Sequence, residues 1–259
     1  MYRFAKHRTH LLLLLAVVMV IAVFFAPPVA QDPDYHDFAD QRTLIGIAHF
    51  WNVLSNLPFV LFGAAGMFVV ARLPAENLAR GLRGAYYIFF IGVLLTGVGS
   101  SWYHLAPDNQ TLFWDRLPMT IAFMALFSIV IGEFVCPVSA KRVLVPLLIA
   151  GAASVLYWDF TEASGVGDLR PYALVQFLPI IVMPIILLAY RSEASTAATF
   201  WVMIALYVAS KVFEQADLAL YEQTAISGHS VKHLFASAAA GYFAWALARR
   251  PSQAASVST

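Results

Sequence analysis

Residues 85–104 of this 259-residue chain are AYYIFFIGVLLTGVGSSWYH, and the final histidine is the only one of them that can carry a charge near neutral pH. A helix needs about 20 apolar residues to cross the hydrocarbon core of a bilayer. The stretch therefore predicts a transmembrane helix. Its last two turns bring polar side chains, Ser100 and His104, to one end of that helix.

Apolar blocks of this length recur along the whole chain. Hydrophobic residues make up 61% of the sequence and charged residues 12%, about half the charged share of a typical soluble domain. We expect eight membrane spans, at residues 11–29, 44–70, 85–104, 112–135, 143–158, 171–190, 199–217 and 229–248. The predicted fold class is all-α: a polytopic transmembrane helix bundle with seven core spans and one N-terminal hydrophobic segment. A net charge of +1 gives no indication of a nucleic-acid partner, and the single cysteine, Cys136, excludes an internal disulfide.

The N-terminal segment has two interpretations. In residues 1–30, basic residues precede an apolar run and two prolines follow it, a pattern shared by a first membrane span and a signal peptide. We favour an uncleaved span. Residues 31–249 are expected to form the seven-span membrane domain, and the small, polar tail at 250–259 is expected to be disordered.

Basic residues between the spans predict the orientation, because cytoplasmic loops are enriched in Lys and Arg. With the N-terminus in the cytoplasm, eleven of the 16 basic residues lie inside: Arg3, Lys6, Arg8, Arg72, Arg80, Arg83, Lys141, Arg142, Arg191, Arg249 and Arg250. The other five lie outside: Arg42, Arg116, Arg170, Lys211 and Lys232. The reverse orientation would violate the rule at nearly every loop.

With this orientation, the polar residues within the spans gather at the outer end. They are Ser100, His104, Asp115, Lys211, Glu214, Asp217, His229, Lys232 and His233. Because a charged group at the centre of a membrane helix costs about 2.5–3.5 kcal/mol, such residues need partners and usually a function. We expect a polar pocket at the outer end of the bundle.

Three histidines in this group predict a metal site. His229 and His233 are one turn apart on one helix face, a spacing that lets two imidazoles bind one ion. His104 lies at the same membrane depth and would supply a third nitrogen. Three protein ligands with a fourth position open is the arrangement of catalytic zinc. In a soluble helix such a pair is more often coincidence, but unpartnered imidazoles inside a membrane would be costly.

Ser100 and Asp115 are the candidate catalytic residues beside the metal. Ser100 lies one turn before His104, and Asp115 follows a short turn that folds the next span back. Alternatively, Ser100 bonds to a helix carbonyl, and Asp115 pairs with Arg116 or caps its helix. Lys211, Glu214 and Asp217 are expected to form a structural ion-pair network, and Asp168 with Arg170 a loop clamp. Hydrogen bonds of Asn52, Ser55 and Asn56 are expected to join helices.

Four pieces of sequence together carry a family resemblance: residues 50–56 (FWNVLSN), 99–104 (GSSWYH), 114–119 (WDRLPM) and 229–233 (HSVKH). They resemble the alkaline ceramidase family of seven-span membrane amidases, and the resemblance extends over residues 34–245. It implies that His104, His229 and His233 ligate zinc, with Ser100 and Asp115 beside the metal-bound water. It also implies cleavage of the amide of ceramide, and a relationship to the adiponectin and progestin receptors.

The sequence departs from that family at two places. Eukaryotic members hold calcium with an acidic N-terminal segment and a glutamate before the FWN motif; here Asp34, Asp37 and Asp40 partly match the segment, but His49 replaces the glutamate. A requirement for calcium is therefore not expected. The residues between the last two histidines are unusually polar, which leaves the substrate open between ceramide and a related N-acyl lipid.

The leading hypothesis is a zinc-dependent intramembrane lipid amidase, with zinc-bound water as nucleophile and Asp115 as general base and acid. It would be a hydrolase of linear amides that yields a fatty acid and an amine. The alternatives are a zinc-stabilised receptor or sensor without turnover, and a proton-coupled transporter that uses Lys211, Glu214 and Asp217 as its relay. The expected partner is a membrane lipid, no protein partner is inferred, and the expected location is the plasma or inner membrane with the zinc site toward the outer face.

Overall fold

The computed structural model describes residues 2–192 and 197–250, with side chains from Arg8 onward. The tail at 251–259 lies outside the described residues. The helices are α1 Tyr2–Phe25, α2 Phe50–Leu54, α3 Leu57–Arg72, α4 Arg83–Leu105, α5 Asn109–Val130, α6 Pro137–Ala163, α7 Arg170–Ala189, α8 Ala197–Gln215, α9 Asp217–Thr224 and α10 Gly228–Ala248. A π-helical turn, Ile131–Val135, extends α5, and short 3-10 turns lie at Pro33–His36 and Ala75–Asn77. No strand forms in the described part of the chain, so the all-α prediction is confirmed.

Seven helical segments in these ranges are long and apolar enough to cross a membrane: Arg8–Phe25, Phe50–Arg72, Arg83–Leu105, Asn109–Val135, Pro137–Ala163, Arg170–Ala189 and Ala197–Gln215. By helix length and composition the chain is a multi-pass membrane protein. The eighth expected span is the 21-residue α10, which is not among the seven. Its first turns carry His229, Lys232 and His233, so its average hydropathy is lower, and it packs between α3 and α8.

Several expected spans have different boundaries in the structure. The helix expected at 11–29 covers Tyr2–Phe25, and the helix expected at 143–158 covers Pro137–Ala163. The span expected at 44–70 begins helically only at Phe50, because Ile45 and His49 have φ values of 47° and 46°. This left-handed conformation is unfavourable for residues other than glycine and cannot continue a helix. The span expected at 199–217 ends at Gln215, and Asp217 begins the separate helix α9.

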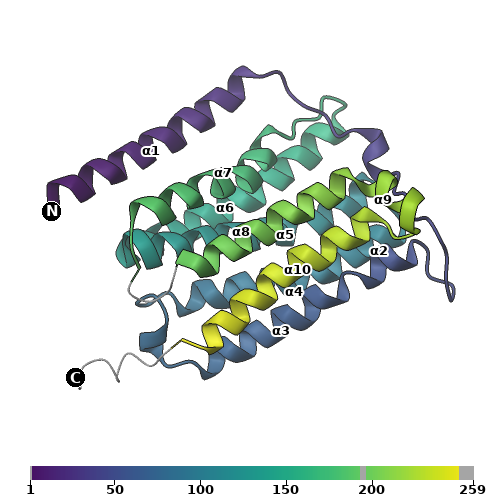
Figure 1. The fold of residues 1–259 in the computed structure, drawn as a ribbon. Coiled ribbons are helices and arrows are strands. Elements are labelled where there is room, and N and C mark those ends of the chain that lie inside the picture. The colour runs from purple at the N-terminus through teal and green to yellow at the C-terminus, as the bar shows by residue number, and fades with distance from the viewer. Residues whose placement is uncertain (1, 193–196, 251–259) are drawn as a thin grey trace.

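The long helices form a bundle in which α4 packs most extensively on α5 and α3, and α10 on α8 and α3. Helix α1 lies along the outside and contacts α7 (Figure 1). The core at the middle of the bundle includes the rings of Phe89, Phe90, Phe200 and Phe243. A smaller cluster at the end that carries α2 and α9 includes Phe38, Tyr103, Leu112, Val155, Trp158 and Tyr172.

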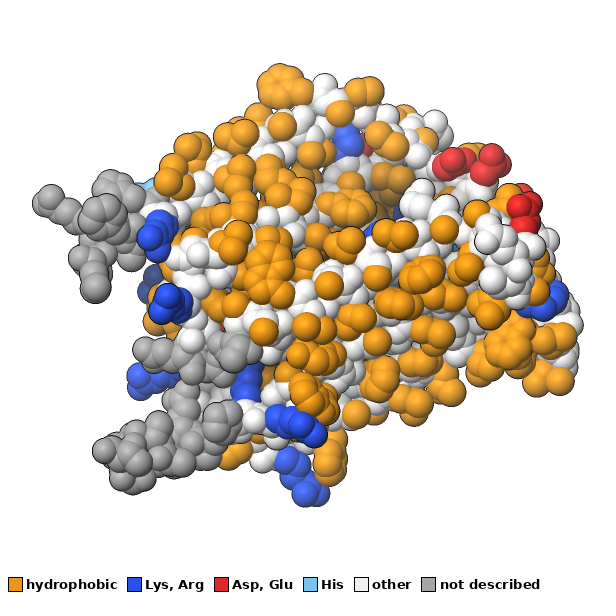
Figure 2. Space-filling view, viewed as in Figure 1, with side chains coloured by type: hydrophobic (Ala, Val, Ile, Leu, Met, Phe, Trp, Pro, Cys, Tyr) orange, Lys and Arg blue, Asp and Glu red, His pale blue; other side chains and the backbone are white. Residues whose placement is uncertain are grey.

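Charged side chains on the face shown in Figure 2 separate by sign between the two ends. Most of the Lys and Arg side chains lie at the end that carries the chain termini, and the acidic side chains lie at the opposite end. Hydrophobic side chains cover the surface between them. This is the surface expected of a bundle that spans a bilayer.

Candidate metal centre

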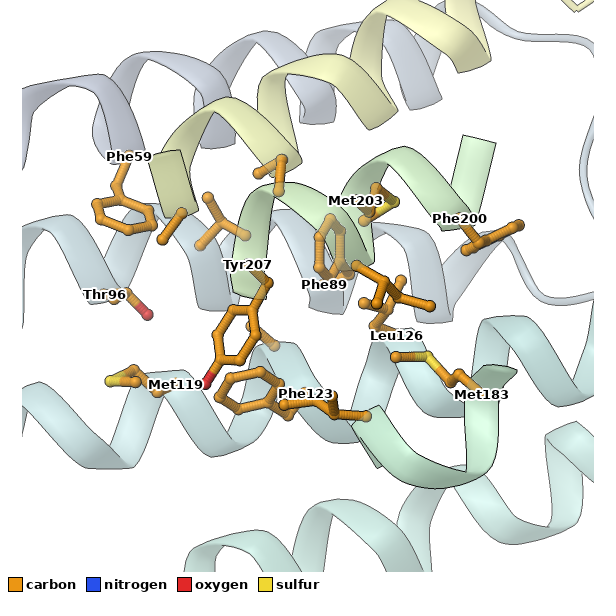
Figure 3. Close-up of a pocket in the computed structure, with 17 residues that line it drawn as sticks. Phe59, Phe89, Thr96, Met119, Phe123, Leu126, Met183, Phe200, Met203 and Tyr207 are labelled. Carbon is orange, nitrogen blue, oxygen red and sulfur yellow. The ribbon is translucent and has the colours of Figure 1, made fainter. Parts of the chain in front are cut away.

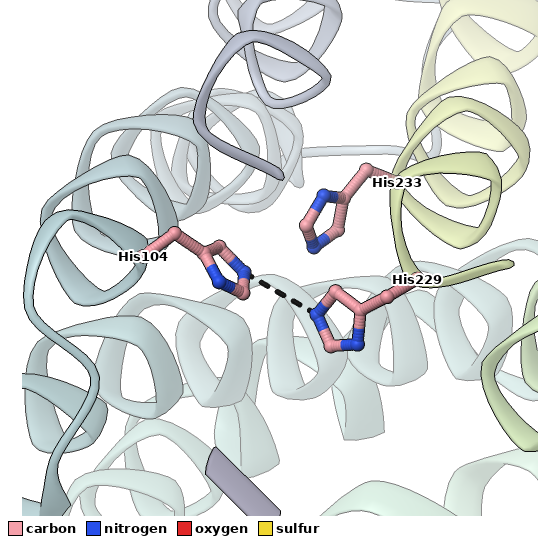
Figure 4. A group of neighbouring side chains, drawn as sticks. All are labelled: His104, His229 and His233. Carbon is pink, nitrogen blue, oxygen red and sulfur yellow. Dashed lines mark hydrogen bonds between the residues drawn. The ribbon is translucent and has the colours of Figure 1, made fainter. Parts of the chain in front are cut away.

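Two helices bring the three predicted ligands together. His104 lies in the last turn of α4, and His229 and His233 lie in the first turns of α10. All three side chains are buried, and their ligand atoms lie within 4.8 Å of one another. Figure 4 shows the three rings converging from the two helices. The i, i+4 spacing on α10 has the effect expected from helix geometry.

The triad fits a zinc ion in distance and in donor type. Nε2 of His104 and Nε2 of His229 are 3.3 Å apart. Two nitrogens that bind one tetrahedral zinc at about 2.0–2.1 Å are about 3.3–3.4 Å apart. Neutral imidazole nitrogens are among the commonest zinc ligands, so the three histidines can hold such an ion.

A hydroxyl from α2's C-terminal end orients the third ring. Ser55 Oγ donates to the carbonyl of Asn52 at 3.1 Å and lies 2.8 Å from Nδ1 of His233. With the hydroxyl proton directed at that carbonyl, Ser55 Oγ is placed to accept a hydrogen bond from Nδ1 of His233 in the Nδ1–H tautomer. The other nitrogen, Nε2, is then unprotonated and available to a metal.

The start of α10 is fixed by hydrogen bonds to its first backbone N–H groups. The Ser227 side chain caps the helix by accepting from the N–H groups of His229 and Ser230. Asp217 Oδ1 accepts from Ser227 Oγ at 2.6 Å and from the His229 N–H at 3.0 Å. Asp217, expected in an ion-pair network, instead caps the helix that carries two of the three histidines.

Close approach of α4 and α5 brings Ser100 beside Asp115. A Cβ on Gly99 would lie 2.0 Å from the Trp114 carbonyl oxygen, so only glycine allows this contact. Pro118 lies inside α5 and has no N–H to pair with that carbonyl four residues earlier. Ser100 and Asp115 are both buried, and both line the same cavity.

The segment at residues 31–43 covers the histidines from the end of the bundle. The Phe38 ring is 4.6 Å from the His104 ring and 4.3 Å from the His229 ring, between centroids. The Ala39 N–H donates to Asp217 Oδ2 at 3.1 Å, which ties this segment to the α10 cap. Asp40 accepts from Arg42 Nη2 at 2.6 Å. Burial alone would raise the pKa of Asp40, but the Arg42 hydrogen bonds and charge outweigh it and lower that pKa.

A polar cavity of about 250 Å³ opens beside the triad. His233, Ser100 and Asp115 lie in its wall, together with Lys211, Glu214 and Lys232. Glu214 forms ion pairs with both lysines, at 2.6 Å to Lys232 Nζ and with Lys211 one turn away on α8. The predicted network of Lys211 and Glu214 is therefore present, with Lys232 as its third member.

Arg116 also lines this cavity and does not pair with Asp115 among the described residues. Its Nη2 donates to Gln31 Oε1 at 2.6 Å. Its guanidinium lies 4.3 Å from the Trp158 ring centroid and 4.8 Å from that of Tyr172. The sequence-based alternative that Asp115 pairs with Arg116 is wrong.

An apolar cavity of about 130 Å³ continues from the polar one toward the middle of the bundle. Both cavities are lined by Phe59, Thr96, Met119, Tyr207 and Ala236. In Figure 3, Phe59, Thr96 and Met119 lie at one end of the apolar cavity, and Met183 and Phe200 lie at the other. One molecule can therefore place a polar group beside the histidines and its aliphatic chain in this apolar cavity.

The other polar residues singled out from the sequence have structural contacts. Arg170 binds Asp168 through Nε at 2.8 Å and Nη2 at 2.7 Å, which confirms the loop clamp. Arg170 also donates to the carbonyl of Ala26 at 2.5 Å, after the end of α1. Asn52 Oδ1 accepts from Ser230 Oγ at 2.7 Å, joining α2 to α10 as expected.

Sequence reasoning missed two contributors to the site. It considered the 31–43 segment only for its acidic residues, and so did not identify Phe38 as the ring over the histidines. It used Arg116 as an outer basic residue and as a possible partner of Asp115, and did not place it in the cavity wall. The local sequence gives no signal for either contact, because the partners are distant along the chain.

Comparison with known proteins agrees with the motifs. The model of the Ceramidase family matches residues 42–250, most of the chain. A curated relative from Dictyostelium discoideum, named "Putative alkaline ceramidase dcd3A", is 28% identical over 102 residues, which cover 34% of this chain and 34% of the relative. The matched part is thus about a third of that relative's length. The resemblance inferred from the four motifs is confirmed: the chain belongs to the ceramidase family.

Proposed function

We propose that the protein is a zinc-dependent lipid amidase that hydrolyses ceramide or a related N-acyl lipid to a fatty acid and an amine. One observation carries the proposal: three buried imidazoles converge beside Ser100 and Asp115, at the polar end of a cavity that continues into an apolar one. Family membership supports the same class of reaction.

His104, His229 and His233 would hold the zinc, which when bound supplies an acidified water and polarises a carbonyl. Asp115 lies in the wall of the cavity beside them. It would take a proton from the attacking water and pass it to the leaving amine. Ser100, which lines the same cavity wall, would donate a hydrogen bond to the reacting oxygen.

The two adjoining cavities would each hold the part of the substrate that matches their polarity. The amide and headgroup would lie in the polar cavity, and the acyl chain would extend past Thr96 and Met119 into the apolar cavity. Segment 31–43, with Phe38 over the histidine rings, would limit access of bulk water from the end of the bundle. Excluding water strengthens the electrostatic interactions within the site.

The orientation we propose places the N-terminus in the cytoplasm and the metal centre at the outer face of the plasma or inner membrane. The basic side chains at the end with both termini support it (Figure 2). Calcium is not proposed as a requirement, because Asp40 is engaged by Arg42 and a histidine occupies position 49.

The test is Asp115→Asn, with the exposed Asp159→Asn on α6 as the matched control. The amide keeps the size of the side chain but accepts a proton poorly, so ceramide turnover should fall by about 100- to 10,000-fold. Zinc content should stay at one ion per chain, since the three imidazoles remain. Purified variants are assayed for metal by elemental analysis and for released fatty acid by mass spectrometry.

Each outcome of this test separates two hypotheses. Hydrolysis by Asp115→Asn at a near wild-type rate would refute Asp115 as the base. A zinc-loaded wild-type protein that hydrolyses none of a panel of lipid amides would favour a receptor or sensor. A transporter is less well supported, because Glu133, near the opposite end of the bundle, is buried and paired with Arg250 at 2.8 Å.

A further inference from the structure

The polar cavity carries more positive than negative side chains. Arg116, Lys211 and Lys232 line it, and the acidic residues in its wall are Asp115 and Glu214. Glu214 is shared by the two lysines, so one carboxylate balances two ammonium groups. Before any metal is counted, one positive charge in the wall of the cavity is left unbalanced.

The Arg116 guanidinium in this cavity wall has an N–H donor without a hydrogen-bond partner among the described residues. Its residue is 5% exposed, and its Nη1 is buried without a hydrogen-bond partner in the part of the chain that the structure describes. Nη2 is used by the neutral amide of Gln31, and the faces of the guanidinium lie near aromatic rings. An aromatic face stabilises a cation but does not satisfy a buried N–H, which costs free energy when it is left unpaired.

The lysines also have donors left. An ammonium group carries three N–H donors, and the hydrogen bonds described for Lys211 and Lys232 each go to Glu214. Lys211 is the more accessible of the two, with its side chain 34% exposed compared with 17% for Lys232. Spare donors on a buried arginine and two partly buried lysines favour an anionic oxygen group as the missing partner.

We propose that this cavity selects N-acyl lipids whose headgroup carries an anionic oxygen group, a carboxylate or a phosphate, which binds among Arg116, Lys211 and Lys232. The inference rests on the proposed amidase function and specifies its substrate class. The headgroup anion would neutralise the unbalanced charge while the amide faces His233, Ser100 and Asp115 in the same cavity wall. An uncharged headgroup would leave the cationic wall without its partner.

Matched substrate pairs test this proposal. Each pair has one acyl chain and one amide but differs in the headgroup: N-palmitoylglycine against N-palmitoylethanolamine, and a phosphorylated ceramide against ceramide. We expect wild-type kcat/KM to be at least about tenfold higher for the anionic member of at least one pair, as one charge-assisted hydrogen bond implies. The pair that shows the preference distinguishes a carboxylate from a phosphate.

Lys211→Met removes one cation and leaves Glu214 paired one to one with Lys232. The ratio of anionic to neutral kcat/KM should fall about tenfold, mainly through KM. Lys141→Met is the control, because Lys141 lies in the second turn of α6, beside Gly81, and does not line the cavity. It should leave the ratio unchanged. If Lys211→Met does not fold, Lys211→Gln is measured in its place.

Binding without turnover provides a second measurement. Anionic lipids should raise the Tm of the zinc-loaded Asp115→Asn protein more than their neutral partners do. Equal or better hydrolysis of the neutral lipids by the wild-type protein would overturn the anion preference and leave the amidase function standing. If no amide is hydrolysed, the amidase function fails, and the Tm comparison alone decides whether the cavity binds anions.

Discussion

Ser55→Ala should weaken zinc binding without changing any zinc ligand. In the structure His233 Nδ1 lies 2.8 Å from Ser55 Oγ, which accepts from it in the Nδ1–H tautomer while donating to Asn52 O at 3.1 Å. Alanine removes the acceptor, so the Nδ1–H group loses its buried partner and the ring is free to rotate or to change tautomer. Loss of such an outer hydrogen bond lowers metal affinity by about 10- to 100-fold, or about 1.4–2.7 kcal/mol. This agrees with the roughly 1–3 kcal/mol cost of one unsatisfied buried donor.

The assay is competition for zinc with a chromophoric chelator, using purified protein in detergent micelles. The control is Ser237→Ala, one turn beyond His233 on α10, because the buried Ser237 hydroxyl donates at 3.0 Å to the Leu234 carbonyl of the same helix. Its zinc Kd should equal that of the wild type. A Ser55→Ala protein whose Kd stays within about twofold of wild type, or a control that weakens equally, would show that this hydrogen bond does not support the metal centre.

Three further predictions concern packing, orientation and pH. Gly99→Ala places a Cβ 2.0 Å from the backbone of α5, so it should lower stability by about 1–3 kcal/mol and abolish amide hydrolysis. Gly84→Ala is the control, because nothing lies within 4 Å of its Cβ, and it should change neither stability nor hydrolysis. Denaturation and activity assays measure the two effects. In a cysteine-free background of intact cells, a cysteine at Gln41 should react with an impermeant maleimide and one at Glu76 should not; the reverse pattern would place the metal centre on the cytoplasmic side. The hydrogen bonds of Arg170 lower the pKa of Asp168. The ionised pair therefore stabilises the fold at pH values above about 4, the usual pKa of an aspartate, and this stabilisation is lost as the pH falls through the lowered pKa. Below about pH 4 the Tm of the wild type should therefore fall more steeply than that of Asp168→Asn, and parallel curves would refute the assignment.

The fold was predictable because a membrane limits what a chain can do. In the hydrocarbon core a segment must satisfy its own backbone hydrogen bonds, so apolar blocks of sufficient length become helices. This argument located α4 and α5 to within a few residues. It failed at residues 44–49, where hydropathy continues but the left-handed backbone of Ile45 and His49 interrupts the helix.

The histidine pair on α10 was predictable for a similar reason. Residues four apart on one helix share a face whatever surrounds them, so the pairing of His229 with His233 follows from local geometry alone. Predicting His104 as the third ligand required only one further condition, that it lie at the same depth in the membrane. The structure places its Nε2 3.3 Å from that of His229.

Partners on different segments could not be assigned in this way. From the sequence, the adjacent Asp115 is the natural partner of Arg116. In the structure the guanidinium instead donates to Gln31, 85 residues away, and lies over the rings of Trp158 and Tyr172. Adjacent residues on a helix point about 100° apart, so neighbours in sequence do not share a face, and the packing of other segments decides what each one meets. The same packing leaves Arg116 Nη1 buried without a partner among the described residues. In the same cavity wall, two lysines share the single carboxylate of Glu214. The proposed preference for an anionic headgroup rests on these contacts between segments that are distant in the sequence.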